Sequence, residues 1–171
     1  MDELVFRPLT RNDLPRLHEW LNRPHVARWW HERPTLDEVV ARYAPAIEGK
    51  DPSDHYIAVA DGREVGFVET YLIADHPDWD AVVHAGPGVA GADLFIAEPS
   101  LTGKGLGTAM LRRFVDEIVF APEKTTACLA DVDVDNTASL RAFEKAGFTR
   151  VGEIVDPESG RPHALLRRER A

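Results

Sequence analysis

Three alternating glycines, Gly103, Gly105 and Gly107, form the segment of the sequence best suited to hold a ligand. Because glycine has no side chain, alternate glycines let backbone N–H groups approach a bound molecule closely. An apolar run precedes them and a segment with helical periodicity follows, and the N-terminus of a helix attracts anions. We therefore expect a diphosphate at this turn. The glycine spacing differs from that of a Rossmann fold, and Lys104 lacks the following Ser or Thr of a P-loop.

Other reactive residue types give weaker signals. The single cysteine, Cys128, lies in an apolar run without an adjacent base, so we expect a buried thiol and not a nucleophile. The seven histidines do not follow the spacing of metal ligands, so no metal is expected.

Charge and composition narrow the possible partners. The 171 residues carry 20 Lys and Arg against 29 Asp and Glu, a formal net charge of −9. Such a chain repels phosphate backbones and anionic lipids, so we expect a cationic small molecule and neither nucleic acid nor a membrane. No apolar stretch approaches the roughly 20 residues that cross a bilayer, and the first residues lack a signal-peptide pattern. We expect a cytoplasmic protein with one domain over residues 1–171.

Segments with the hydrophobic pattern of strands and segments with that of helices surround the glycine turn in the sequence. Strands are expected at residues 4–9, 54–60, 64–73, 92–97, 125–132, 149–155 and 163–167. A turn at Asp61 and Gly62 joins the second and third, and the last two are expected to form a hairpin. Helices are expected after residues 13, 35, 108 and 136, with Leu36 on the apolar face of the second and Pro24 ending or kinking the first. Thr35 is expected to cap the second helix, and Asn136 or Thr137 the last. Residues 74–91 are expected to be a loop. This order predicts a mixed α/β sheet with helices packed against it.

Residues 92–148 resemble the GCN5-related N-acetyltransferase superfamily. The resemblance rests on the turn Thr-Gly-Lys-Gly-Leu-Gly at residues 102–107 and on the segment that begins at Asn136 and ends in Glu-Lys-Ala-Gly-Phe. It implies a mixed sheet whose two central strands splay apart, and acetyl-coenzyme A as the acetyl donor. It further implies the cofactor-binding residues, which are Leu94, Phe95, Ile96, Thr102, Gly103, Lys104, Gly105, Leu106, Gly107, Thr108 and Asn136.

Two positions depart from the family pattern. The family often has Gln or Arg where this chain has Thr102. It commonly has Tyr, the usual proton donor to the leaving thiolate, where this chain has Phe143. Phe143 has no proton to donate, so another group or water protonates the thiolate, or the thiolate leaves without help.

A wider resemblance, across most of the chain, is to the aminoglycoside 6'-N-acetyltransferase branch. It is carried by residues 17–26, 29–30, 33–36, 56–58, 69–71, 87–93 and 103–108. It implies direct attack of a substrate amine on the thioester in a ternary complex, with Asp93 as general base or amine-positioning residue and Asp131 as a ligand of a substrate amino group. Several carboxylates suit a polycation whose reacting amine must lose a proton. The further candidates for the substrate site are Asp133, Glu69, Tyr71 and Trp30.

Three other functions stay open on the sequence. A siderophore or hydroxylysine N-acyltransferase shares the segment at residues 20–30. A protein N-terminal acetyltransferase has the same fold but needs an open groove for peptides. A coenzyme A-binding sensor without catalysis is suggested by Phe143. In each case we expect a monomer or a homodimer.

Overall fold

The structure is a computed structural model, and it describes residues 2–171. The described chain forms two compact units. The first comprises the residues up to Glu69 together with Leu94–Leu101, and the second comprises Thr70–Asp93 together with Thr102–Ala171.

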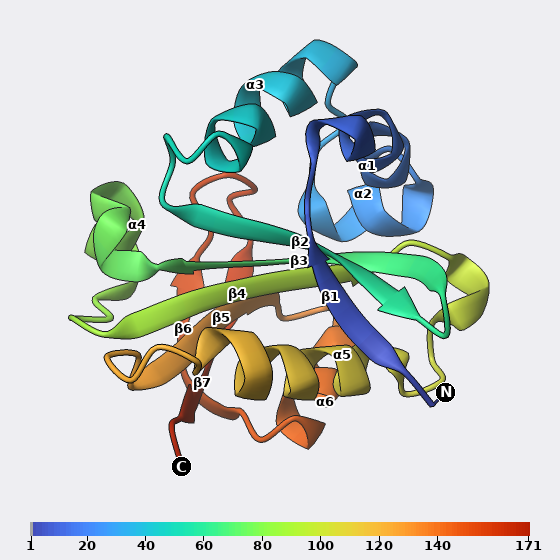
Figure 1. The fold of residues 1–171 in the computed structure, drawn as a ribbon. Coiled ribbons are helices and arrows are strands. Elements are labelled where there is room, and N and C mark those ends of the chain that lie inside the picture. The colour runs from blue at the N-terminus through green and yellow to red at the C-terminus, as the bar shows by residue number, and fades with distance from the viewer. Residues whose placement is uncertain (1) are drawn as a thin grey trace. The chain divides into compact units, whose positions relative to one another are not determined.

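The first unit combines three helices with the N-terminal strands. Its elements are β1 (Leu4–Pro8), η1 (Arg11–Asp13), α1 (Leu14–Leu21), α2 (Pro24–Trp30), α3 (Leu36–Ile47), β2 (Ser53–Ala60), most of β3 (Arg63–Leu72) and η3 (Pro99–Leu101). Helix α1 packs against α2 and α3 (Figure 1). Leu17, Tyr43 and Phe67 are fully buried in its core. Asp61 and Gly62 have left-handed φ angles of 48° and 79°, so the predicted hairpin turn between β2 and β3 is confirmed.

Two details of this unit differ from the prediction. Pro24 does more than end a helix, because it is the first residue of α2, where its missing N–H costs no hydrogen bond. Leu36 is 40% exposed and not on the buried face of α3, because it occupies the first position of that helix. The predicted cap of α3 is confirmed, since the Thr35 hydroxyl accepts a hydrogen bond from the Glu38 N–H at 3.2 Å.

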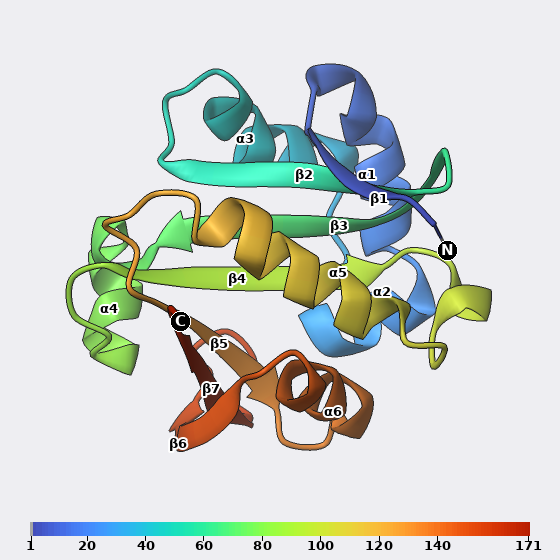
Figure 2. The ribbon, with the colours of Figure 1, turned by 60° about the horizontal axis from the view of Figure 1, so that its bottom comes forward.

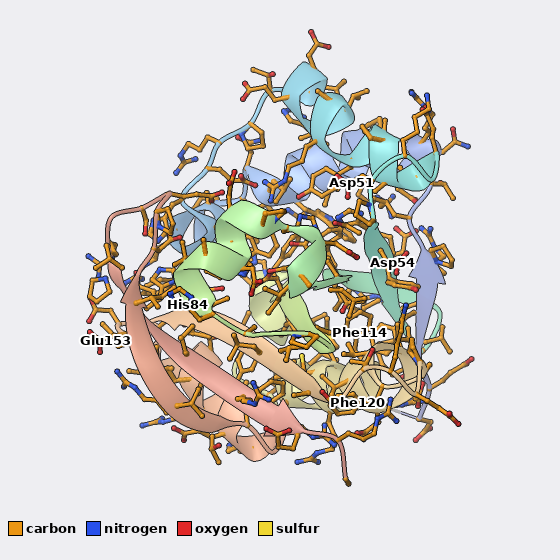
Figure 3. All side chains as sticks on the ribbon, turned by 90° about the vertical axis from the view of Figure 1, so that its left-hand side faces the viewer. Asp51, Asp54, His84, Phe114, Phe120 and Glu153 are labelled. Carbon is orange, nitrogen blue, oxygen red and sulfur yellow. The ribbon has the colours of Figure 1, made fainter. Side chains whose placement is uncertain are left out.

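The second unit contains the glycine turn and the C-terminal strands. Its elements are η2 (Ile73–Asp75), α4 (Pro77–Val83), the first part of β4 (Val89–Ile96), α5 (Leu106–Phe114), the π-helical segment η4 (Val115–Val119), β5 (Ala127–Asp133), α6 (Thr137–Lys145), β6 (Thr149–Val155) and β7 (Pro162–Glu169). Helix α5 packs against α6, and β7 lies between β5 and β6 (Figure 2). Phe114 and Phe120, labelled in Figure 3, are buried in this unit.

The prediction of a loop over residues 74–91 is wrong. Residues 77–83 form α4, and β4 already begins at Val89. Pro77 fixes the φ angle at the first helical position, and the carboxylates of Asp78 and Asp80 favour the N-terminal end of a helix. Val83 and Val89 are buried with Ile73, so apolar contacts hold the segment in place.

The seven strands form a mixed sheet in the order β1-β2-β3-β4-β5-β7-β6. Strands β4 and β5 are parallel, whereas β1 with β2, β5 with β7, and β6 with β7 are antiparallel. The predicted mixed α/β fold is therefore confirmed. Within residues 2–171, none of the helices is long and apolar enough to span a bilayer.

Candidate functional site

The glycine turn leads directly into α5, as predicted. Gly103 and Gly105 have φ angles of 72° and 84°, in the left-handed region that favours glycine, and Gly105 is the N-cap residue of α5. A Cβ atom built on either glycine would meet no atom within 4 Å, so the space in front of the backbone is open. The first N–H groups of a helix have no partners within the helix. Together with the positive end of the helix dipole, they suit a diphosphate.

The two central parallel strands, β4 and β5, are paired along only part of their length. Their ladder joins Val89 to Ala127, Ala90 to Cys128 and Gly91 to Leu129, and it ends there. Strand β4 continues to Ile96 and strand β5 to Asp133 without further pairing to each other. The loss of pairing beyond Gly91 agrees with what the family resemblance implies for these two strands.

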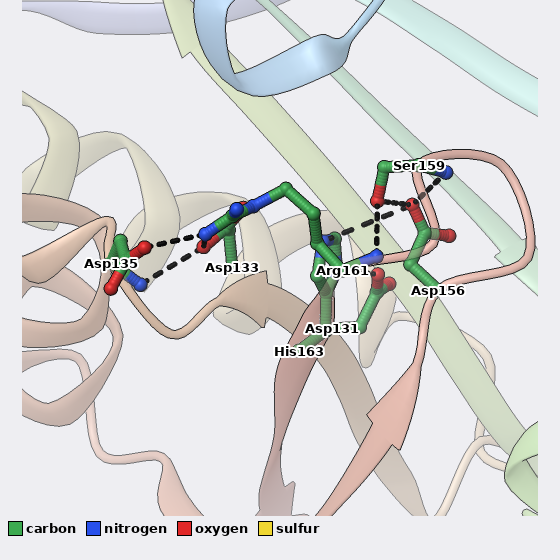
Figure 4. Close-up of polar contacts among 7 residues, drawn as sticks. All are labelled: Asp131, Asp133, Asp135, Asp156, Ser159, Arg161 and His163. Atoms are coloured by element: carbon green, nitrogen blue, oxygen red, sulfur yellow. Dashed lines mark hydrogen bonds and ion pairs between the residues drawn. The ribbon is translucent and has the colours of Figure 1, made fainter.

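Asp133, at the end of β5, is held by a guanidinium (Figure 4). Arg161 Nε donates to Asp133 Oδ2 at 2.6 Å, and Arg161 also pairs with Asp135 at 2.5 Å. The Asp133 side chain is only 2% exposed. The hydrogen bond from Arg161 outweighs burial and lowers the pKa of Asp133 to about 2. Asp133 is thus a charged carboxylate whose two oxygens are already engaged by protein donors.

His163, on β7, lies between two further carboxylates (Figure 4). Its Nδ1 is 2.8 Å from Asp131 Oδ2, and its Nε2 is 3.8 Å from Asp156 Oδ2. Asp156 Oδ2 also accepts hydrogen bonds from the Ser159 N–H at 3.0 Å and the Ser159 hydroxyl at 2.6 Å. Burial alone would lower the pKa of His163, but the hydrogen bond and charge of Asp131, with the charges of Asp156 and Asp133, raise it overall.

The sequence missed Arg161, His163 and Asp156 as functional candidates. Histidine spacing along the chain gave no sign of a cluster, yet the ligand atoms of Asp131, Asp156 and His163 all lie within 4.8 Å of one another. The β6–β7 hairpin causes this, because it returns residues 156–163 to the end of β5, where His163 is paired with Asp133 in the ladder. In the sequence, the predicted hairpin of residues 149–155 and 163–167, with basic residues beside its turn, was the one feature that pointed to this cluster.

Asp93, the proposed base, lies half-buried on β4. It is two residues beyond the last rung between β4 and β5. Burial, with a smaller effect of the Asp93 charge, raises the pKa of the Cys128 thiol to about 12. The fully buried Cys128 is therefore a neutral thiol, in agreement with the prediction that it is no nucleophile.

Tyr71 is on β3, and its ring lies against Gly91 on the neighbouring strand β4. A Cβ atom on Gly91 would come within 2.5 Å of the Tyr71 ring, so only glycine fits beneath the ring. The Thr70 hydroxyl donates to the Gly91 carbonyl at 2.8 Å and fixes the two strands at this point. Tyr71 is also in edge-to-face contact with His76, at a centroid distance of 4.9 Å.

Two predicted substrate residues, Glu69 and Trp30, belong to the first unit. Glu69 is 8% exposed, and its Oε2 is 3.0 Å from Nε2 of His55. Trp30, on α2, contacts Phe95 edge to face at a centroid distance of 5.3 Å. Both side chains are therefore packed within their unit, and their substrate contacts stay a prediction.

The expected backbone ligands of the cofactor, Leu94, Phe95 and Ile96, end β4 in the first unit. His25 Nε2 lies 2.9 Å from the Ile96 carbonyl oxygen. Arg23 donates to the next carbonyl, that of Ala97, at 2.7 Å. Side chains from α2 and the residue before it thus anchor the end of this strand.

Asn136 is the N-cap of α6, and Phe143 is a buried residue within that helix. The Asn136 side-chain oxygen accepts a hydrogen bond from the Ser139 N–H at 3.3 Å, which confirms the predicted cap. Its side-chain NH₂ group has no part in the cap. Phe143 is buried and packs edge to face against Phe148 at 5.0 Å, as a core residue does.

Comparisons with known proteins agree with this geometry. Residues 10–155 match the family described as acetyltransferase (GNAT) domain. The chain is 36% identical over 160 residues to aminoglycoside N(6')-acetyltransferase type 1 of Klebsiella pneumoniae, covering 92% of this chain and 79% of that protein. The crystal structure of aminoglycoside acetyltransferase AAC(6')-Ib with coenzyme A superposes with a TM-score of 0.89 at 33% identity, covering 98% of this chain and 95% of that chain. The complex of that enzyme with coenzyme A and kanamycin gives a TM-score of 0.88 at 33% identity, with the same coverage. The chain belongs to the GNAT acetyltransferase family.

Proposed function

We propose that this chain is an acetyl-coenzyme A-dependent aminoglycoside N-acetyltransferase that modifies a 6'-amino group. The observation that carries the proposal is the likeness, over nearly the whole chain, to an enzyme whose structure contains coenzyme A and kanamycin. The net charge of −9 suits a polycationic substrate. We further propose a cytoplasmic monomer or homodimer that needs no nucleic acid and no membrane.

The residues around the glycine turn fit the cofactor. Acetyl-coenzyme A supplies an acetyl group activated as a thioester. The open space before Gly103 and Gly105, which a Cβ atom would fill, supports binding of its diphosphate by backbone N–H groups. In this proposal Thr102, Lys104, Leu106, Gly107 and Thr108 complete the diphosphate site. Residues 94–96 bind the pantetheine arm through their backbone, and the Asn136 side-chain NH₂ lies beside it.

The acceptor side of the reaction uses carboxylates. Asp93 takes the proton that the attacking amine must lose, and Asp131 binds an ammonium group of the substrate. Asp93 comes directly before residues 94–96 on β4, whose backbone is proposed to bind the thioester, and this position supports its role. The amine nitrogen adds to the acetyl carbonyl, and backbone N–H groups of residues 94–96 stabilise the negative charge on the carbonyl oxygen of the tetrahedral intermediate. The carbon–sulfur bond then breaks and coenzyme A leaves as the thiolate. Tyr71, Trp30, Glu69 and Asp133 complete the proposed substrate site.

A direct assay tests the proposal. The purified chain is incubated with acetyl-coenzyme A and a panel of aminoglycosides, and a thiol reagent measures the coenzyme A released. We expect turnover of aminoglycosides that have a 6'-amine and none of a matched compound with a 6'-hydroxyl. Mass spectrometry and NMR of the product identify the acetylated nitrogen.

The same assay separates the other functions. Turnover of lysine or hydroxylysine with long-chain acyl-coenzyme A, and none of aminoglycosides, would make the chain a siderophore-type acyltransferase. Acetylation of peptide N-termini would make it a protein acetyltransferase. Tight binding of acetyl-coenzyme A with no turnover of any amine would leave a sensor, and each of these results would overturn the proposal.

A further inference from the structure

We propose that His163 is a positioning residue that holds one oxygen of Asp131 so that the other can bind a substrate ammonium group. The inference rests on the proposed function, and it deepens that function by assigning a role to a residue outside the family resemblance. It also distinguishes Asp131 from Asp133, which are both candidates for the substrate site on the sequence.

The contact between His163 and Asp131 is short and protected. His163 is 6% exposed, and its Nδ1 approaches Asp131 Oδ2 to 2.8 Å. In the β5–β7 ladder Asp131 is opposite Leu165, so His163 reaches it along the diagonal between neighbouring strands on the same face. The Asp131 side chain is 18% exposed, and among residues 2–171 no protein donor engages its Oδ1. This oxygen is therefore available to a ligand.

The other side of the imidazole ring faces the hairpin turn. Nε2 has no hydrogen-bond partner among the described residues, and it faces Asp156 Oδ2 at 3.8 Å. Asp156 is itself held by Ser159 (Figure 4). The hydrogen bond between Nδ1 and Asp131 therefore sets the orientation of the ring and of the carboxylate, as histidine–carboxylate pairs do in the second shell of metal sites.

Asp133 differs from Asp131 in its contacts. Arg161 engages both Asp133 oxygens, at 2.6 and 3.3 Å, and the Asp135 N–H also donates to Oδ1 at 2.9 Å. Asp133 therefore orients Arg161 and Asp135, and it has less capacity for a substrate ammonium group than Asp131 has.

The charge of the cluster still favours a cation. Within the second unit, four carboxylates, those of Asp131, Asp133, Asp135 and Asp156, lie with one guanidinium and one imidazole. Even when His163 is protonated, the cluster stays negative. His163 therefore does not displace a polycationic substrate by charge, and its role is to orient Asp131.

Three variants of His163 distinguish the loss of its hydrogen bond to Asp131 from the loss of its ring. His163→Ala removes the ring, His163→Phe keeps a ring without N–H donors, and His163→Asn keeps an N–H donor. Loss of a hydrogen bond to a charged group corresponds to roughly tenfold in affinity. We expect His163→Ala and His163→Phe to raise KM for the aminoglycoside about tenfold with kcat within about twofold, and His163→Asn to stay within about threefold of wild type. The KM for acetyl-coenzyme A should not change.

His84→Asn is the matched control, because His84 is exposed at the end of α4 (Figure 3) and its φ of 52° is tolerated by Asn. It should leave every constant unchanged. If His163→Ala does not fold, the Phe and Asn variants decide the result. Equal aminoglycoside KM values in wild type, His163→Phe and His163→Asn would overturn the role of His163 while leaving the proposed function intact. A wild-type protein that acetylates no aminoglycoside would instead overturn the proposed function and this inference with it.

Discussion

Arg161 Nε donates a hydrogen bond to Asp133 Oδ2 at 2.6 Å and ties the start of β7 to the end of β5. The residues are 28 positions apart in the chain. One partner is almost fully buried, whereas the guanidinium is 41% exposed. The pair therefore lies between a surface ion pair, which contributes little, and a buried one, whose disruption is costly.

Arg161→Gln should lower the free energy of unfolding at pH 7, because it leaves the buried Asp133 carboxylate without its guanidinium partner. Urea unfolding followed by circular dichroism measures the change. Arg113→Gln is the control, because Arg113 forms an exposed pair with Glu117 four residues on, and its loss should cost about 0.5 kcal/mol or less. Equal losses in the two variants would contradict the prediction.

The same pair predicts a pH dependence. The pKa of Asp133 is lowered in the folded chain to about 2, whereas an unfolded aspartate titrates near 3.9. Its stabilisation is therefore fully present above pH 4 and is lost as the pH falls through about 2. The difference between wild type and Arg161→Gln should be constant from pH 6 to 8 and should shrink below about pH 4. A difference that does not change with acidification would show that the pair is not ionic.

Gly105→Val should abolish binding of acetyl-coenzyme A, because its side chain would occupy the open space before the turn and the residue has a left-handed φ. Gly62→Val is the control, since Gly62 has nearly the same φ of 79° and no atom within 4 Å of a built Cβ. Both variants should lose about 1–2 kcal/mol of stability. Isothermal titration calorimetry should show lost cofactor affinity only for Gly105→Val. Retained affinity in that variant would place the diphosphate elsewhere.

Asp93→Asn should lower kcat about 100-fold or more while the affinity for acetyl-coenzyme A stays near that of wild type, because the variant cannot accept the amine proton. Asp54→Asn is the control, since Asp54 is exposed on β2 (Figure 3). Steady-state kinetics and calorimetry measure the two quantities. Unchanged kcat in Asp93→Asn would remove Asp93 from the mechanism.

Cys128→Ala should keep its catalytic activity, because a fully buried thiol with a pKa of about 12 is not a nucleophile at neutral pH. In the folded wild type, iodoacetamide at pH 8 should leave Cys128 unmodified, and labelling should occur only after denaturation. Intact-protein mass spectrometry follows the label. Acetylation of Cys128 after mixing with acetyl-coenzyme A would contradict direct transfer to the amine.

Local signals in the sequence predicted much of this structure. The glycine turn, the caps at Thr35 and Asn136 and the Asp61–Gly62 hairpin all depend on neighbouring residues, and all are present. Helix α4 was missed because Asp, His and Pro are typical of loops, although Pro77 suits a helix start.

The cluster at the end of β5 was beyond sequence reasoning for a different reason. Asp131 and His163 are 32 residues apart, and only the register of β5 with β7 brings them together. No local pattern specifies that register. The carboxylates could be proposed from the family resemblance, but their basic partners could not.

The β6–β7 hairpin carries Arg161 and His163, so the basic residues belong to a different part of the chain from the carboxylates they contact. The carboxylates lie on β5, which pairs on one side with β4 and on the other with β7, whereas their basic partners lie just past a reverse turn near the C-terminus. Insertions and exchanges in such turns disturb a sheet little. Changes confined to residues 157–160 of this turn could therefore shift the basic partners of the β5 carboxylates, with the glycine turn left untouched.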